Sequence, residues 1–335
     1  MASGYQPIRL IVVDNGSDEG SCERVEQWLA GLDRSVVTLD YEIDRCDDLY
    51  MRRLVAGTPG AEDAELVLIR SAVNRGYSAG MNLGLAYREA CRPAPYFWLL
   101  NNDVLVGAGA LQELVRTCQS DPSIGVCGTL QMRVDERGAP TRRPIPGGFG
   151  YLPWLGIDWS IRRANPTSTD AAYVQRHMFG VPGAAVFGTQ ALLRSIGKLN
   201  EESFIYYEEQ DLAVRARRAG FKLAWAERSH VQHLDGQTFQ RHAAGRTSPV
   251  RPYLMARARL AFTRREYPWA VPTVFAAQIG RAVLNRALGR RSTIGAELRG
   301  AIDGVLGRHA RFPQLGNALL PGRVYEPKRW NGGRS

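Results

Sequence analysis

The sequence predicts an α/β protein with a mostly parallel sheet, flanking helices and a helical, basic C-terminal tail. Two observations lead to this fold class. Short apolar runs alternate with helical patterns over the first 230 residues, which is typical of parallel sheets. Polar, turn-forming residues directly follow several of those runs, as in open α/β sheets with loops at the carboxyl ends of their strands. The chain has 335 residues, of which 44% are hydrophobic, enough for one large or two smaller domains.

The regular elements follow from periodicity. Apolar runs bounded by turn residues predict strands at residues 8–13, 35–39, 65–69, 96–100, 125–130, 184–187 and 222–226. Apolar residues at helical spacing predict helices at residues 21–32, 81–90, 110–118, 190–196 and 209–219. Residues 40–65 form a charged insertion with no strong period, and residues 138–166, rich in Gly, Pro and Trp, form a long loop or lid.

The segment from Pro252 onward is expected to be helical and basic. One helical face carries Val271, Val274, Phe275, Ile279 and Val283. Gln278 and Arg281 interrupt this stretch, so it is too short to span a bilayer. The face either lies in a membrane interface or packs on the rest of the chain, and the pattern leaves both open. We therefore expect one domain over residues 1–240 and a basic, amphipathic extension over residues 241–335.

Charge is distributed unevenly. Residues 1–110 carry 10 Lys and Arg against 16 Asp and Glu, a net charge of −6, whereas residues 241–335 carry 18 against 4, a net charge of +14. Such a tail suits an anionic membrane surface or a nucleic acid, although an Arg-rich solvated surface explains it equally well. No helix-turn-helix, zinc-finger spacing or RNP-like aromatic motif is present, so we expect no nucleic-acid partner.

The five cysteines show no CxxC pair and no even framework. No secretory pattern stands at the amino end of the sequence. We therefore expect free thiols in a reducing, cytoplasmic compartment and no zinc site.

Four polar clusters could carry chemistry. They are Asp14-Asn15-Gly16-Ser17, the Gly-rich turn of residues 74–82, Asn101-Asn102-Asp103, and residues 206–212, which are followed by His230 and His233. Each alone has an ordinary explanation as a turn, a helix start or a structural histidine. Together, they offer oxygen and nitrogen ligands for Mg²⁺ or Mn²⁺.

These motifs, in this order, resemble the family 2 glycosyltransferases of the GT-A fold, a Rossmann-like fold, and especially their rhamnosyltransferase-like bacterial members. The resemblance rests on the strand ending in DNGS, on NxGxxxGxN, on LLNND and on YxEExDLxxR, and it covers roughly residues 8–240. The RARLAFTRREYP stretch is similar to the tail of the same group.

The resemblance implies a donor side to the site. Asp14 would contact the nucleobase of a nucleotide-sugar, with Asn15 beside it. The donor pocket would also be lined by Asn74, Gly76, Asn82, Asn101 and Asn102. Asp103 would hold a divalent metal on the donor diphosphate, together with His233, whereas His230 would be a strand residue. Only one residue of the Asn101-Asn102-Asp103 triplet is acidic, so the metal affinity should be modest.

The resemblance also implies a catalytic and acceptor side. Glu209 falls at the position of the catalytic base, where many relatives carry Asp, and Glu208 stands beside it. Asp211 would contact the acceptor or orient the base. Gly183 would lie at the turn beneath the acceptor.

An acceptor hydroxyl is a poor nucleophile until a carboxylate accepts its proton, and one base with one metal fits direct displacement with inversion. The expected function is therefore metal-dependent, inverting transfer of a sugar to a saccharide or polyprenyl-linked acceptor in cell-surface polysaccharide synthesis. dTDP-rhamnose is the leading donor, with UDP- and GDP-sugars open. The enzyme would be cytoplasmic and peripheral at the inner face of the membrane, held to anionic lipid by its tail.

Members of this group normally begin with a further strand, a Thr-Tyr-Asn-like loop and a helix before the strand that ends in DNGS. Residues 1–7 resemble the end of that helix. We therefore expect Met1 to be an internal methionine and the first βα unit to be missing. This keeps a second function open, that of a catalytically impaired nucleotide-sugar-binding protein from a truncated gene product.

Overall fold

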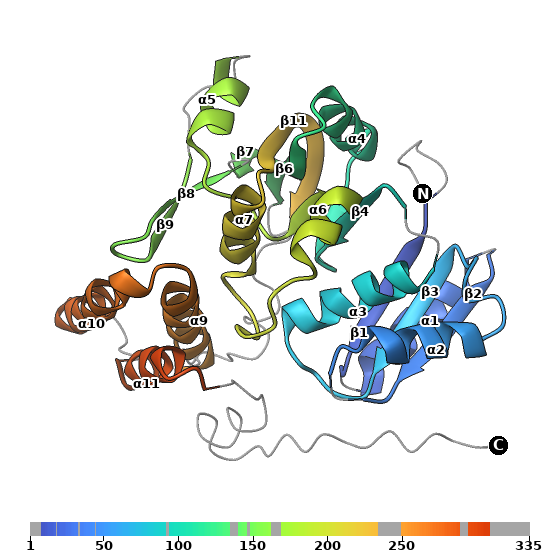
Figure 1. Cartoon of the computed structure of the whole chain (residues 1–335), viewed down its shortest axis with the longest axis horizontal. Coiled ribbons are helices and arrows are strands. Elements are labelled where there is room, and N and C mark those ends of the chain that lie inside the picture. The colour runs from blue at the N-terminus through green and yellow to red at the C-terminus, as the bar shows by residue number, and fades with distance from the viewer. Residues whose placement is uncertain are drawn as a thin grey trace. The chain divides into compact units, whose positions relative to one another are not determined.

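The structure is a computed structural model of the whole chain (Figure 1). It describes residues 8–17, 19–32, 34–43, 45–91, 94–134, 140–145, 148–161, 169–233, 249–288 and 294–308. These residues fall into two compact units. The N-terminal unit is built from Pro7–Ala94 and Lys198–Ile205, and the C-terminal unit from Pro95–Gly197 and Tyr206–Arg308.

The N-terminal unit is a parallel three-stranded sheet with helices. Its strands are β1 (Leu10–Asn15), β2 (Val36–Tyr41) and β3 (Leu66–Ser71), in the order β1-β3-β2. Its helices are α1 (Glu19–Ala30), α2 (Asp48–Gly57) and α3 (Tyr77–Ala90). Alternate residues of a strand point to opposite faces. Val67 and Ile69 accordingly pack in one core with α2 and α3, whereas Arg70 forms an ion pair with Glu26 of α1.

Helix α2 overturns the expectation that residues 40–65 are an irregular insertion. Asp47 caps the helix, because its Oδ1 accepts hydrogen bonds from the backbone N–H groups of Leu49 and Tyr50, each at 3.0 Å. Met51 and Val55, four residues apart, are fully buried in the core. The period is only two turns long and lies among charged residues, so the sequence pattern concealed it.

The C-terminal unit contains a six-stranded sheet in the order β4-β10-β6-β11-β5, with β7 paired to β6. The strands are β4 (Tyr96–Leu100), β5 (Val104–Val106), β6 (Ile124–Val134), β7 (Pro140–Ile145), β10 (Ala185–Thr189) and β11 (Lys222–His233). The long central strands β6 and β11 are parallel, and the other neighbours are antiparallel. The predicted α/β class is confirmed; the parallel arrangement extends over the whole first sheet and the centre of the second.

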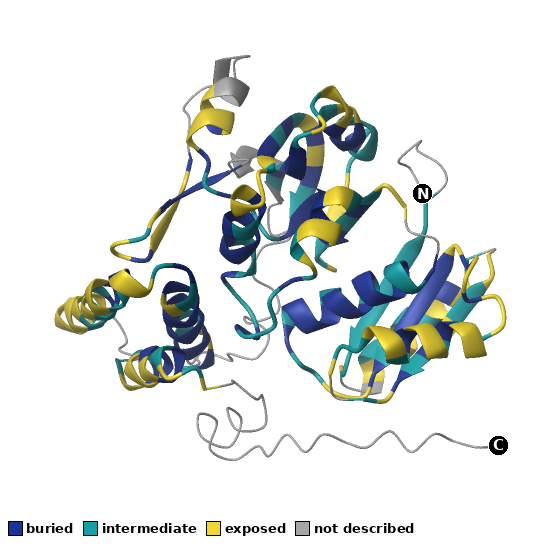
Figure 2. Cartoon of the chain, viewed as in Figure 1, coloured by how far each residue is buried: buried dark blue, intermediate teal, exposed yellow. Residues whose placement is uncertain are grey.

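The helices around this sheet are α4 (Ala110–Ser120), α5 (Thr169–His177), α6 (Gln190–Ile196) and α7 (Glu208–Arg218). Figure 2 shows that burial is concentrated in the central strands and in the helix faces turned toward them. The predicted lid of residues 138–166 is partly regular, because it contains β7 and a hairpin of β8 (Phe149–Leu152) and β9 (Ile157–Ser160). Gly150 allows this hairpin to form tightly, since the Trp159 ring lies where a Cβ would stand.

Three further helices complete the C-terminal unit: α9 (Val250–Glu266), α10 (Val271–Ala287), preceded by the 3-10 turn η1 (Pro268–Ala270), and α11 (Ile294–Val305). They pack through Leu260, Val274 and Ala301. The apolar face predicted on α10 is therefore divided: Val274 is buried with Gln278 and Ala282, whereas Val283 is 54% exposed. The expected boundary near residue 240 lies in 234–248, outside the described residues.

All five cysteines are free, as predicted. Among the described residues, no helix has both the length and the apolar character needed to cross a bilayer.

Candidate active site

Asp103 and His233 come together through a strand that the sequence did not reveal. β5 pairs with the end of β11, so that Val104 stands opposite His233. Asp103, one residue earlier, places its Oδ1 3.2 Å from Nε2 of His233, and both side chains are largely buried. The nearby imidazole holds the pKa of Asp103 below its usual value.

This pair suits a divalent metal held partly by a substrate. A carboxylate oxygen and an imidazole nitrogen are accepted ligands of Mg²⁺ and Mn²⁺. The buried Oδ1 of Asp103 faces Nε2 of His233 and has no further hydrogen-bond partner among the described residues. Within the described part of the chain, no group of three or more His, Cys, Asp or Glu could hold a metal ion. The residues therefore fit a cation that completes its coordination with phosphate oxygens and water, as Mg²⁺ commonly does.

Asn101 and Asn102 precede this pair at the end of β4. The backbone N–H of Asn101 donates to the carbonyl of Ala184 at 2.9 Å. The side-chain oxygen of Asn101 is buried and has no hydrogen-bond partner within the described part of the chain, whereas Asn102 is exposed. An orphaned buried oxygen is costly and is compatible with a hydroxyl ligand, although the donor role of both residues stays a prediction.

The start of α7 is a strained turn that carries two glutamates. Tyr206 and Tyr207 have positive backbone φ angles of 73° and 68°, which residues other than glycine rarely adopt. Tyr207 is fixed in this conformation because its hydroxyl accepts a hydrogen bond from Arg259 Nε at 2.7 Å and donates one to the Gly156 carbonyl at 3.1 Å. The turn thereby sets the direction of Glu208 and Glu209.

Glu209 lies beside Gly183, as the two predicted roles require. A Cβ added to Gly183 would stand 3.5 Å from the carboxyl carbon of Glu209. Ala184, the next residue, accepts the hydrogen bond from Asn101. These contacts connect Glu209 with the turn at Gly183, and that turn with Asn101 at the end of β4. All of these residues lie within the C-terminal unit.

Burial changes the ionisation of both glutamates. Burial is the largest cause that raises the pKa of Glu209 to about 7, and the charge of Asp158 on β9 contributes to that rise. Burial, together with the charge of Glu209, raises the pKa of Glu208 well above its usual value. Oε2 of each residue is buried without a hydrogen-bond partner among the described residues. Burial therefore favours the neutral form of both carboxyl groups, and Glu209, with a pKa of about 7, is able to accept a proton near neutral pH.

Asp211, predicted to contact the acceptor or to orient the base, is held by two arginines, and its role in orienting the base stays a prediction. Its side chain is 1% exposed, and its two oxygens contact Arg215 Nε at 2.7 Å and Arg265 at 2.6 Å. A carboxylate held by two guanidinium groups in the interior ties α7 to α9. The structure thus contradicts a direct contact between Asp211 and an acceptor.

In the N-terminal unit, the loops after β1 and β3 meet as expected. Asn15 Nδ2 donates to the Gly76 carbonyl at 2.8 Å, and Asn74 Oδ1 accepts from the Gly76 N–H at 3.0 Å. Gly16 has a φ of +67°, and a Cβ there would collide with the backbone of Asn74. Asp14 lies next to this junction at the end of β1. These residues form the loop pair at the carboxyl edge of the sheet, and their contacts with a donor stay predictions.

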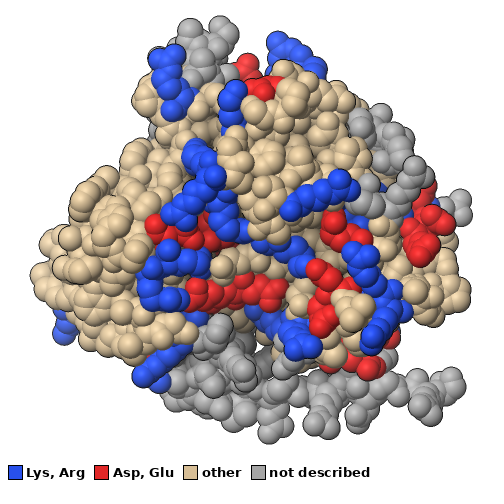
Figure 3. Space-filling model, in the orientation of Figure 1, with Lys and Arg blue, Asp and Glu red and all other residues tan. Residues whose placement is uncertain are grey.

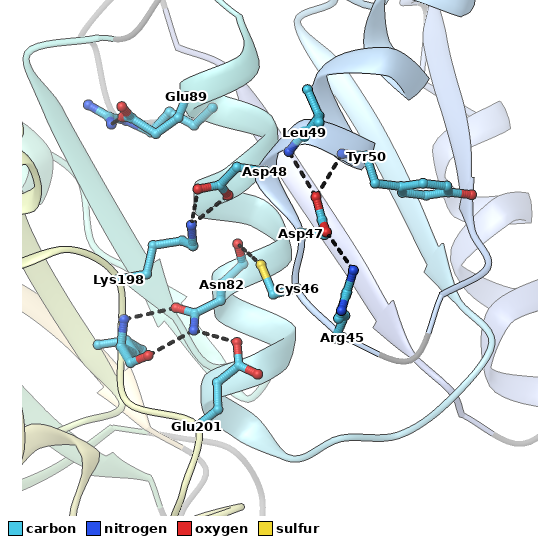
Figure 4. A network of polar contacts seen from close by, with 12 residues as sticks. Arg45, Cys46, Asp47, Asp48, Leu49, Tyr50, Asn82, Glu89, Lys198 and Glu201 are labelled. Atoms are coloured by element: carbon cyan, nitrogen blue, oxygen red, sulfur yellow. Dashed lines mark hydrogen bonds and ion pairs between the residues drawn. The ribbon is translucent and has the colours of Figure 1, made fainter.

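Asn82 is a structural residue, contrary to its predicted place in the donor pocket. It is 2% exposed. Figure 4 shows its amide directed at the segment that follows α6: Nδ2 donates to Leu199 O at 2.8 Å and to Glu201 at 2.7 Å, and Oδ1 accepts from Leu199 N at 2.9 Å. With all of its polar groups used inside the protein, Asn82 holds residues 198–205 on α3.

Sequence reasoning missed Asp158, whose charge acts on Glu209, and the pair of Tyr207 and Arg259, which fixes the turn before the glutamates. Asp158 lies in the predicted lid, but a single acid in a Trp-rich segment gave no signal of its own. The contact of Tyr207 with Arg259 joins residues 52 positions apart, which no local pattern reports.

The fold and these residues define the class of the protein as a GT-A glycosyltransferase fold. A crystal structure of GalNAc-T7 with UDP, GalNAc and Mn²⁺ is similar to 93% of this chain and 50% of that one, with a TM-score of 0.51 and 12% sequence identity, which supports the fold alone.

The chain belongs to the family described as "Glycosyltransferase like family 2", whose family model matches residues 44–247. It is 26% identical over 181 residues to a low-salt glycan biosynthesis hexosyltransferase, Agl10, of Haloferax volcanii, covering 51% of this chain and 54% of the relative. It is 26% identical over 197 residues to the N-acetylglucosaminyl-diphospho-decaprenol L-rhamnosyltransferase of Mycobacterium tuberculosis, covering 53% and 60%. The matches therefore span little more than half the length of these relatives.

Proposed function

We propose that this protein is a metal-dependent, inverting glycosyltransferase that moves a sugar from a nucleotide-sugar to a saccharide or lipid-linked acceptor in cell-surface polysaccharide synthesis. The observation that carries the proposal is Glu209, a carboxyl group with an unpartnered buried oxygen and a pKa raised to about 7, beside the glycine turn at residue 183.

Glu209 is the base in this proposal. An acceptor hydroxyl placed against Gly183 would donate its proton to Glu209 while its oxygen attacks the anomeric carbon of the donor. Because the pKa of Glu209 lies near neutrality, the carboxylate is available and is a stronger base than an exposed glutamate. Glu208, whose pKa is raised well above its usual value by burial and by the charge of Glu209, is the less suitable base in this proposal. With one base and no carboxylate nucleophile, the displacement is direct and inverts the anomeric configuration.

Asp103 and His233 would hold the divalent cation, for which Mg²⁺ and Mn²⁺ are the candidates. When bound, such a cation supplies positive charge to the leaving nucleoside diphosphate. Asn101, whose side-chain oxygen has no hydrogen-bond partner among the described residues, would accept a hydrogen bond from a donor hydroxyl, with Asn102 beside it. The donor roles of Asp14, Asn15, Asn74 and Gly76 stay predictions.

The donor and acceptor follow from the relatives. One relative is named as a rhamnosyltransferase acting on a decaprenyl diphosphate-linked sugar and another as a hexosyltransferase. dTDP-rhamnose is therefore the first donor to test, followed by UDP- and GDP-sugars, and a polyprenyl diphosphate-linked saccharide is the first acceptor.

The proposal is tested by a screen of nucleotide-sugars with Mg²⁺ and Mn²⁺, in which release of the nucleoside diphosphate and the anomeric configuration of the product are both measured. We expect one donor class to be turned over, with inversion and with loss of activity in excess EDTA. A retained configuration, or full activity in EDTA, would contradict the mechanism.

A further inference from the structure

Exposed hydrophobic side chains gather on one part of the C-terminal unit. Ten of the eighteen large hydrophobic side chains that are exposed in the described chain lie on the hairpin of β8 and β9, on η1, or on α10 and α11, and two more, Leu288 and Leu306, directly follow those two helices. Among them, Trp154, Trp159 and Trp269 are each more than half exposed. Soluble proteins rarely expose large apolar side chains in such concentration unless the surface binds something.

Specific contacts hold the hairpin on the helices. Trp154 lies against Trp269 of η1, with 4.2 Å between ring centroids, and the Trp154 carbonyl accepts a hydrogen bond from the Thr273 hydroxyl at 2.7 Å. Gly156, at the hairpin turn, has no room for a Cβ against Val274. The tip of the hairpin and the start of α10 therefore present one continuous surface.

An apolar groove continues this surface between α10 and α11. It has a volume of about 340 Å³ and is lined by Val271, Pro272, Phe275, Ile302, Val305 and Leu306. Val271, which lines the groove, follows Trp269 by two residues, so the groove begins at the end of the turn that carries Trp269. We call Trp154, Trp269 and this groove the Trp–Leu face.

The charges beside the Trp–Leu face are mainly positive. Arg281, Arg286 and Arg299 are exposed on α10 and α11. The acids of the same helices are engaged inside the protein, because Glu297 accepts a hydrogen bond from Gln278 and Asp303 is bound by Tyr253 and Arg308. Figure 3 shows a broad surface without Lys, Arg, Asp or Glu on the left of the view, with both basic and acidic side chains at its edge.

We propose that the Trp–Leu face docks on an anionic phospholipid surface. Tryptophan favours the interface of a bilayer, where its ring is buried among lipids and its N–H meets the headgroups. Exposed arginines beside an apolar surface add attraction to anionic headgroups. A second copy of the chain would bring the same arginines against one another, so charge favours an anionic surface over self-association. The inference rests on the proposed function in that a lipid-linked acceptor lies at such a surface.

The test is co-sedimentation of the full chain with phosphatidylcholine vesicles, with and without phosphatidylglycerol. We expect binding to the anionic vesicles that weakens in high salt. The double variant Trp154→Ala/Trp269→Ala should bind at least about ten-fold more weakly, since two large apolar contacts are lost. The matched control is Trp28→Ala, because Trp28 on α1 of the other unit is 54% exposed. Arg286→Glu/Arg299→Glu should remove the preference for phosphatidylglycerol.

Binding that the double tryptophan variant retains, or that Trp28→Ala loses equally, would overturn the proposal. The proposal would also be overturned if light scattering showed dimers that the double tryptophan variant does not form, while no vesicle binding is seen. The face would then be an interface between copies. Nucleoside diphosphate release with a soluble acceptor is measured in parallel. Vesicle binding without that release would refute the proposed function and leave the docking surface standing.

Discussion

The carboxyl group of Glu209 faces Gly183 at the distance of an ordinary van der Waals contact, 3.5 Å from the position of a Cβ at residue 183. A side chain larger than a methyl group at residue 183 would crowd the carboxyl group, and glycine keeps this position free of side-chain atoms. The first prediction follows from this contact.

The rate of sugar transfer should rise with pH through about 7, because Glu209 must be ionised to accept a proton and its pKa is raised to about 7. Gly183→Ala adds a methyl group against the carboxylate and removes water from it, so the midpoint of this rise should move to higher pH. The measurement is kcat against pH for both proteins at saturating donor. An unchanged midpoint in Gly183→Ala would show that the titrating group is not Glu209.

Glu208 should lower the stability of the protein as the pH rises. Its pKa is raised on folding, so its favourable contribution is complete below the usual glutamate pKa and is lost as the group ionises at higher pH. Glu208→Gln should therefore raise the melting temperature at pH 8 by a few degrees, about 2 to 4 °C, and change it little at pH 4.5. Glu113→Gln on α4, whose salt bridge is near the surface, serves as the control. Equal effects at both pH values would contradict a buried, protonated Glu208.

The metal site is tested through donor binding. Asp103→Asn keeps the shape of the side chain but removes the charge, so the affinity for nucleoside diphosphate in the presence of Mn²⁺ should fall at least about ten-fold. Affinity in EDTA should change little. Isothermal titration of the diphosphate, with and without Mn²⁺, separates the two effects. His233→Ala should show the same pattern, and a loss of affinity that is equal in EDTA would point to a fold defect instead.

Asn82 should contribute to stability and not to donor contact. Asn82→Ala removes three hydrogen bonds and leaves the Leu199 amide and carbonyl groups without their buried partner, at a cost of about 2 to 3 kcal/mol. Lys198→Met, which breaks the neighbouring ion pair with the half-exposed Asp48, should cost less than about 1 kcal/mol. Urea unfolding measures both. A variant with normal stability and a raised KM for the donor would restore Asn82 to the donor pocket.

Much of the fold could be predicted because its strands are short apolar runs between turns. β4 and α6 were found with their observed bounds, and the free thiols followed from cysteine spacing. α2 was missed because only Met51 and Val55 mark its buried face among many charges. β5 was missed because Leu105 and Val106 are exposed in a three-residue strand, which lies below the length at which alternation is visible.

The sequence indicated which residues belong to the candidate site, but not which of their polar groups are already bound within the protein. The sequence indicated Asp103, His233, Gly183 and Glu209. In the structure, Asp103 lies against His233, and Glu209 lies against Gly183. Asp211 and Asn82 stand in the same motifs, yet their side chains turn inward to Arg215 and Leu199. A motif gives the spacing of polar residues along the chain, whereas only the packing decides which of them are satisfied by the protein itself.

The most direct test of the account is the single-turnover rate of sugar transfer by Glu209→Gln, with donor affinity measured on the same protein. The amide is similar in shape but cannot accept the hydroxyl proton as a base. We predict a rate at least about 100-fold lower with a nearly unchanged donor dissociation constant. A transfer rate equal to that of the unmodified protein would show that Glu209 is not the base.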